Sequence, residues 1–215
     1  MTAISSNPSL LIRAIRRGLR PVGLETVGRS LYHRMTRRSS APASETAKCR
    51  ERLAQFCAGY GLDIGFGGDP ITSHAIRMDM PQPYTNVGAM PVQLGGDATH
   101  LVWFADGTLD FVYSSHVLED FVDVSAVLAE WLRVLKCGGR LIIYCPDEMA
   151  YRRYCAETGH GYNPHHVHAD FSLSFVKGEL ARLGTAVRIL HEAPLVDVYS
   201  WELVLEKLSR DAAAS

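Results

Sequence analysis

The sequence predicts an α/β fold, a doubly wound sandwich in which helices cover both faces of a mainly parallel sheet. A short apolar run at residues 60–64 leads directly into the glycine-rich turn of residues 65–68. This is typical of a buried parallel strand followed by a turn whose backbone approaches a ligand closely. Later in the chain, an amphipathic helix at residues 123–136 is followed by two glycines and the apolar run of residues 140–145. A helix followed by a fully buried strand is the other half of such an architecture.

Composition limits the class of protein. The 215 residues are 47% hydrophobic and 21% charged, which is typical of one globular domain with a short appendage. The five cysteines form no Cys-x-x-Cys pair and leave one unpaired, so we expect reduced thiols and a cytoplasmic location. No apolar run approaches the roughly 18–20 residues that cross a bilayer.

Positive charge is concentrated in the first 50 residues, which contain 10 Lys or Arg against 2 acids, while the rest contains 12 against 21. Residues 10–20 predict an amphipathic helix with arginines on one face, and Pro21 ends it. We expect residues 1–44 to form a basic helical arm and linker, and residues 45–215 to form the main domain. Three interpretations of the arm stay open: a lid or homodimer contact, a surface for anionic lipid or nucleic acid, and a targeting segment.

The other elements follow from hydrophobic periodicity and from their end signals. Ser44 is the expected N-cap of a helix at residues 45–57, Asp123 that of the helix at 123–136, and Gly184 ends a helix at 171–183. The expected strands are residues 60–64, 75–79, 92–94, 111–114, 140–145, 185–190 and 200–208.

Acidic residues close the second and third expected strands. Asp79 ends the second strand, and Asp97 follows Gly95-Gly96 after the third. A carboxylate at the end of the second strand suits hydrogen bonds to the two hydroxyls of a ribose. Together with the glycine turn, these strand ends predict a nucleoside-binding edge of the sheet.

Five segments carry a resemblance to a known family: residues 62–68, Asp79, residues 96–98, residues 109–119 and residues 133–143. In this order, and over about residues 55–208, they resemble the S-adenosylmethionine-dependent methyltransferases of the Rossmann-like class. The last two segments are the most specific, because a helix, Leu-Lys-x-Gly-Gly and an apolar strand rarely occur together by accident. The resemblance implies a seven-stranded sheet with the last strand antiparallel, and S-adenosylmethionine as the cofactor.

The resemblance also implies the cofactor residues. Gly65 and Gly67 belong at the methionine and ribose, Asp79 at the ribose hydroxyls, Asp97 and Ala98 at the adenine, and Ser114 and Ser115 beneath the methionyl end. Asp63 and Phe66 belong to the same glycine motif and complete the predicted set.

The glycine motif departs from the family pattern. Asp69, followed by Pro70, stands where a third motif glycine is usual. Only 14 positions separate Gly65 from Asp79, where about 20 are typical. We therefore expect the first crossover helix to be very short or absent. Asp69 would also lie near the cofactor's carboxylate unless its side chain points away.

His116 and Asp147 are the candidate catalytic residues. Methyl transfer from a sulfonium requires positioning and, at most, removal of a proton from the acceptor. His116 follows the fourth strand and can be a general base, or it can be a structural histidine that holds the loop at residues 114–119. Asp147 follows the fifth strand and is a candidate carboxylate for substrate contact.

A histidine-rich loop occupies residues 160–170. Its histidines and Asp170 are ligand types for a transition metal, but the loop lacks the two-part spacing of a closed zinc site. The alternatives are a plain surface loop and, favoured by its position after the fifth strand, a substrate-site loop. With His116, the residues expected at the acceptor are therefore Asn163, His165 and His168, and no metal is predicted.

The predicted activity is methyl transfer to an oxygen or nitrogen of a small molecule, such as a sugar or secondary metabolite. One alternative is an RNA methyltransferase that uses the basic arm to contact phosphates, although no nucleic-acid module is visible. The other is a scaffold that binds S-adenosylmethionine without turnover.

Overall fold

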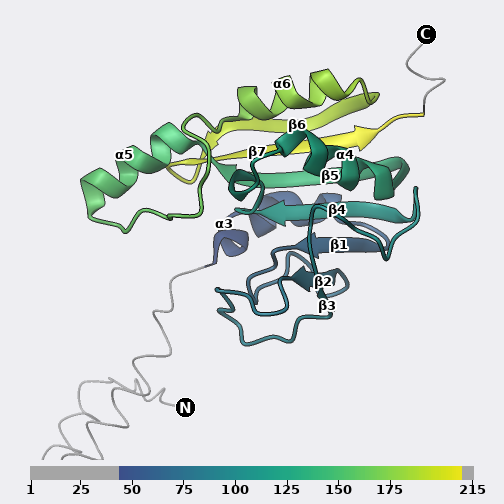
Figure 1. Cartoon of the computed structure of the whole chain (residues 1–215), viewed down its shortest axis with the longest axis horizontal. Helices are drawn as coiled ribbons and strands as arrows, with labels where there is room; N and C mark the ends of the chain where they lie inside the picture. Colours follow the sequence, from purple (N-terminus) through teal and green to yellow (C-terminus); the bar gives the residue numbers. More distant parts are fainter. Residues whose placement is uncertain (1–43, 210–215) are drawn as a thin grey trace, which may run out of the picture. The chain divides into compact units, whose positions relative to one another are not determined.

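The computed structural model describes residues 44–209, and the expectations for the basic arm lie outside this range. A seven-stranded sheet has the order β3-β2-β1-β4-β5-β7-β6, with β7 antiparallel to both of its neighbours and the other strands parallel (Figure 1). The strands are β1 (Gly61–Ile64), β2 (Ile76–Asp79), β3 (Leu94–Gly95), β4 (Leu109–Ser115), β5 (Leu135–Pro146), β6 (Val187–Val196) and β7 (Ser200–Lys207). The predicted fold class and the antiparallel last strand are confirmed.

Alternating side chains of β4 divide the core between the two faces of the sheet. Val112 packs with α4 (Val124–Val134) and α6 (Leu173–Leu183) in the larger cluster. Phe111 and Tyr113 point to the opposite face and pack with α3 (Glu45–Leu53). The sheet is therefore buried on both sides, as the near-continuous apolar strands predicted.

No helix connects β1 to β2, which confirms the expectation of a shortened crossover. Other groups hold this connection in place. The Ile71 N–H donates to the buried Asp63 Oδ2 at 2.7 Å. Asp69 forms an ion pair with Arg50 and accepts a hydrogen bond from Ser44, so its carboxylate turns toward α3. Ile71 and Ala75 of this connection also pack with α3 in the core, so apolar contacts and ion pairing together hold the segment that lacks a helix.

The helix at residues 123–136 ends two residues earlier than predicted, at Val134. Leu135 is already extended and pairs with Leu109, while Arg140 pairs with Phe111. Residues 136–139 therefore bulge out of the sheet, and Gly138 takes a φ of 78° that favours glycine. The two glycines form this bulge and do not end the helix.

One helix was not predicted: α5 (Glu148–Thr158), which follows β5 (Figure 1). Its end signals are present in the sequence, because Asp147 caps its first turn and Gly159 ends it with a φ of 72°. The apolar face of this helix is weak, because its only buried residues are Glu148, Ala150, Tyr151 and Cys155. None of the helices in residues 44–209 is long and apolar enough to cross a bilayer.

Candidate functional site

A cavity of about 1190 Å³ lies at the carboxyl edge of the parallel strands. Pockets for ligands of drug size typically measure about 300–1,000 Å³, so this one has room for a nucleoside-type cofactor and a small second molecule. Its walls come from the loops after β1, β2, β3 and β4, the first turn of α3, the loop after α5 and the turn before β7. Of the predicted residues, it is lined by Gly65, Phe66, Gly67, Asp79, Asp97, Ala98, Ser115, His116, Asn163 and His165.

The glycine turn brings its backbone to the cavity. Gly65 and Gly67 have φ values of 68° and 57°, which L side chains rarely adopt. A Cβ on Gly65 would lie 2.2 Å from Val117, so this position has no space for a larger residue. Asp79 faces the same space and accepts from the Gly67 N–H at 3.2 Å and from the Met80 N–H at 2.8 Å. A carboxylate has about four lone-pair sites, so two remain for ribose hydroxyls.

The adenine end of the predicted site is more exposed. Asp97 accepts from the Thr99 N–H at 2.8 Å, and its side chain is 63% exposed. The Ala98 carbonyl accepts from Trp131 Nε1 at 2.9 Å, which fixes this loop to α4. Hydrogen bonds from Thr99 hold the pKa of Asp97 below its usual range, so the carboxylate is ionised at neutral pH.

Two predicted cofactor residues lie beneath the cavity and do not line it. Asp63 is fully buried under the glycine turn, and burial raises its pKa to about 7. Ser114 is also fully buried, and its hydroxyl donates to the Ile64 carbonyl at 3.3 Å. Both were expected at the cofactor, and in the structure their side chains bond to the backbone that carries the site.

Ser115 differs from Ser114 because it does line the cavity. It is 7% exposed, and its Oγ has no hydrogen-bond partner among residues 44–209. A buried hydroxyl without a partner costs free energy, so a ligand that pairs with it gains affinity. With the free lone pairs of Asp79, this hydroxyl shows that the described residues fit the cofactor expected from the sequence.

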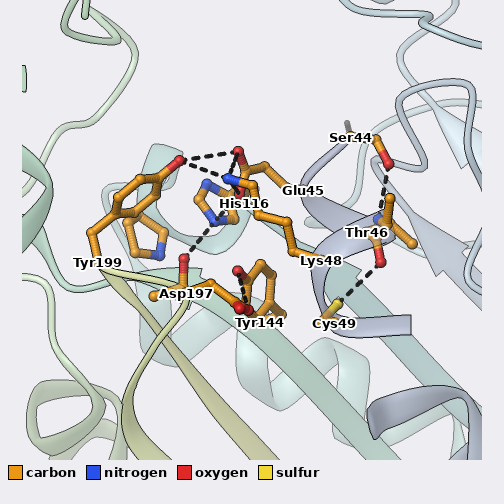
Figure 2. A network of polar contacts seen from close by, with 12 residues as sticks. Ser44, Glu45, Thr46, Lys48, Cys49, His116, Tyr144, Asp197 and Tyr199 are labelled. Atoms are coloured by element: carbon orange, nitrogen blue, oxygen red, sulfur yellow. Dashed lines mark hydrogen bonds and ion pairs between the residues drawn. The ribbon is translucent and has the colours of Figure 1, made fainter. Parts of the chain in front are cut away.

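His116 lies at the end of β4 with a φ of 52°, an uncommon value for a residue with a side chain. Its Nε2 is 3.3 Å from Glu45 Oε2 (Figure 2). The same nitrogen is 3.3 Å from Ser200 Oγ, and Nδ1 is 3.7 Å from Glu119 Oε1. Burial lowers the pKa of His116 to about 4, although Glu45 acts in the opposite direction. The imidazole is therefore neutral at physiological pH, and the same burial makes it a weaker base than an exposed histidine.

Glu45 and Tyr199 complete this part of the cavity, and neither was predicted. Lys48 Nζ donates to Glu45 at 2.7 Å and to the Tyr199 hydroxyl at 2.9 Å, which joins α3 to the turn before β7 (Figure 2). Tyr199 also donates to Glu45 at 3.1 Å. Glu45 and Tyr199 are far apart in the sequence and belong to no shared motif. Their proximity therefore depends on the fold alone.

The histidine-rich loop divides into residues that face the cavity and residues that anchor the loop. His165 lines the cavity and stacks on Tyr84 with ring centroids 4.9 Å apart, and Asn163 lies beside it. His166 does both: it lines the cavity and is held by the buried Glu148, with Nδ1 at 2.8 Å from Oε2. His168 was expected at the acceptor but does not line the cavity, and its Nε2 contacts the Phe121 carbonyl at 2.7 Å.

No group of three or more His, Cys, Asp or Glu side chains within residues 44–209 is arranged to hold a metal ion. The nearest arrangement in this part of the chain has His166 between Glu148 and Glu119, with the Glu119 oxygen 3.6 Å from Nε2. The two carboxylates contact different ring nitrogens of His166, so the three side chains cannot share one ion through this imidazole and are arranged as hydrogen-bonding partners.

Asp147 lies outside the cavity lining and caps α5, accepting from the Ala150 N–H at 3.0 Å. This residue was expected to contact substrate, and the structure gives it a capping role. We expect Asp147→Ala to lower the free energy of unfolding by about 1 kcal/mol, the usual effect of losing an N-cap. Denaturant unfolding measures this change, and the variant should keep the kcat of the parent. A large fall in kcat without a loss of stability would indicate that Asp147 acts in catalysis and that its capping contact matters little for folding.

Comparison with known proteins places this geometry in context. A family model described as "Methyltransferase domain" matches residues 62–143. Demethylmenaquinone methyltransferase from Thermobifida fusca (strain YX) is 54% identical over 50 residues, which are 23% of this chain and 21% of that protein. The chain thus matches about a fifth of the length of this curated relative.

Solved structures resemble the whole domain. A SAM-dependent methyltransferase from Archaeoglobus fulgidus superposes with a TM-score of 0.58 at 16% identity, over 82% of this chain and 98% of that one. A chain in the complex of the Haloferax volcanii Trm112 methyltransferase activator with a methyltransferase has a TM-score of 0.55 at 16% identity, over 76% and 89%. At such identity these matches establish the fold.

Proposed function

We infer the reaction from the family: the chain belongs to the S-adenosylmethionine-dependent methyltransferases of the Rossmann-like class, and we propose that it methylates an oxygen or nitrogen of a small molecule. The observation that carries this proposal is the position of His116. This neutral imidazole lies in the same cavity as the glycine turn and Asp79. A proton acceptor is thus available in the space where donor and acceptor meet.

S-adenosylmethionine supplies an activated methyl group when bound. Asp79 and the glycine turn would orient the nucleoside, and Asp97 with Ala98 would mark its adenine end. His116 would take the proton that the acceptor atom loses, and the Glu45 carboxylate 3.3 Å away would stabilise the imidazolium that forms. This arrangement needs no further catalytic group.

The charge of the cavity supports an acceptor without phosphate groups. None of the described lining residues is Lys or Arg, whereas Glu45, Asp79, Asp97 and Asp120 are all acidic. Aromatic side chains of Tyr84, Tyr151, Phe121 and Tyr199 cover much of the rest. These side chains favour a neutral or cationic acceptor, and they disfavour a polyanion such as RNA in this cavity.

The two alternative functions make different predictions. Calorimetric binding of S-adenosylmethionine with no turnover on any of a broad panel of alcohols, amines and RNA would favour the scaffold. Methylation of RNA that is lost on deletion of residues 1–44 would favour the nucleic-acid reading. Release of S-adenosylhomocysteine only when a small alcohol or amine is present would support our proposal.

We also propose the domain boundary at residues 44–45 and a cytoplasmic location. The location is supported by the five cysteines, which are all free thiols in the structure.

Two kinds of assembly are further candidates: a homodimer, and a complex with an activator subunit as in the Haloferax volcanii structure. Light scattering of the purified chain, alone and with candidate partners, tests both.

The loop after α5 is proposed to shape the acceptor site, and substitutions of two of its four histidines, His165 and His168, should have different effects. We expect His165→Ala to raise the KM for the acceptor several-fold with a smaller change in kcat, because His165 lines the cavity. His168→Ala should lower stability by about 1 kcal/mol, through loss of its bond to the Phe121 carbonyl, and change KM little. Equal effects of both substitutions on KM would contradict this division of the loop.

A further inference from the structure

We propose that the first turn of α3, together with Ser115, binds the carboxylate at the amino-acid end of S-adenosylmethionine, in place of the glycine turn. This inference rests on the proposed function, because it assigns a part of the same cofactor. It adds a binding site on a helix that precedes the sheet in the chain.

The glycine turn has few donors left for an anion. Gly65 N–H and Phe66 N–H both donate to the Met78 carbonyl, at 2.9 and 3.4 Å, and Gly67 N–H donates to Asp79. No helix follows this turn, so the positive end of a crossover helix is missing as well. Since no described lining residue is Lys or Arg, the anion must be met by other groups.

The first turn of α3 supplies such groups. Ser44, Glu45 and Thr46 line the cavity, and α3 is a nine-residue helix whose positive dipole end therefore faces it. Ala47 N–H is capped by Ser44 Oγ at 2.9 Å. The N–H groups of Glu45 and Thr46 have no acceptor within residues 44–209, as is usual in a first turn.

The acidic residues near this turn are already paired. Lys48 lies 2.7 Å from Glu45 and holds its carboxylate toward Tyr199 and His116 (Figure 2). Arg50 pairs with Asp69, which also accepts from Ser44. Each carboxylate thus has a cationic partner, which reduces its repulsion of a bound anion.

Ser115 is the independent observation that points to a ligand. The residue lines the cavity and is 7% exposed, and its buried hydroxyl has no partner among the described residues. It also lies on the face of β4 that carries Phe111 and Tyr113 against α3, where the Tyr113 hydroxyl donates to Thr46 Oγ1 at 3.2 Å. Ser115 is the next residue in this row toward the cavity, so its free hydroxyl and the first turn of α3 lie on the same side.

Two ligands that differ only in the amino-acid part test the proposal by calorimetry. S-adenosylhomocysteine has the carboxylate, whereas 5′-methylthioadenosine keeps the nucleoside and thioether without it. Ser115→Ala should weaken S-adenosylhomocysteine binding about tenfold or more and leave 5′-methylthioadenosine binding unchanged. Ser114→Ala is the matched control, because that hydroxyl is satisfied by the Ile64 carbonyl, and it should not change the ratio of the two affinities.

A second pair of variants probes the backbone of α3. Ser44 has an extended conformation with ψ at 158°, so proline is tolerated at the next position, the first of the helix. Glu45→Pro removes an N–H that Glu45→Ala keeps, and should bind S-adenosylhomocysteine several-fold more weakly than Glu45→Ala. Equal losses for both ligands in Ser115→Ala, or equal affinities of the two Glu45 variants, would overturn the proposal. Failure of the parent to bind either ligand would instead overturn the proposed function.

Discussion

His116→Asn is expected to lower kcat by roughly 10²–10⁴-fold while S-adenosylhomocysteine binds as in the parent. This is the usual contribution of a positioned general base. Asparagine is the substitution to make, because it tolerates the left-handed backbone at φ 52° better than alanine does. Single-turnover kinetics at saturating cofactor measures the chemical step, and calorimetry provides the binding control. Full turnover in the variant would leave His116 with only the structural role of holding the loop after β4.

The pH dependence of the same reaction gives an independent check. Burial lowers the pKa of His116 to about 4, so the fraction of neutral, proton-accepting imidazole rises with pH through that value. Activity should therefore increase from pH 4 to about 5.5 and stay flat from there to pH 8. If the base were an exposed histidine with a pKa near 6.5, the enzyme would reach half of its maximal activity near pH 6.5. An inflection near 6.5 that disappears in His116→Asn would show that the imidazole is more exposed to solvent than its contacts imply.

Most of the sheet could be predicted because its strands are apolar runs next to glycine and aspartate. The first strand, the acid at the end of the second and the helix before the fifth strand are all local patterns, and the structure has each of them. Ser44 and Asp123 cap helices as expected. The absence of a full crossover helix could also be predicted. The 14 positions from Gly65 to Asp79 are too few for a full helix together with the turns at its two ends.

The contacts within the site could not be predicted, because they depend on tertiary position. Glu45, His116 and Tyr199 come from three distant segments, and only the packing of α3 and the β6–β7 turn brings them together. Asp147 follows a strand at the ligand-binding edge, as catalytic residues often do, yet a helix begins at the next residue and uses its carboxylate as a cap. Serines 114 and 115 are adjacent, but alternation along β4 turns one toward the Ile64 carbonyl and the other toward the cavity.

Asp79→Ala should weaken S-adenosylhomocysteine binding by about 1.5–3 kcal/mol, or roughly 10- to 150-fold, because a charged acceptor of the ribose hydroxyls is lost. Asp79 also accepts from the Gly67 N–H, so part of the loss could reflect movement of the glycine turn. A ligand lacking one ribose hydroxyl separates the two effects: it should bind the parent more weakly than S-adenosylhomocysteine, and Asp79→Ala should bind both alike. Such a double-mutant cycle isolates the interaction between the carboxylate and the hydroxyl. If Asp79→Ala keeps the parent's affinity, or still discriminates between the two ligands, the ribose is held elsewhere in the cavity.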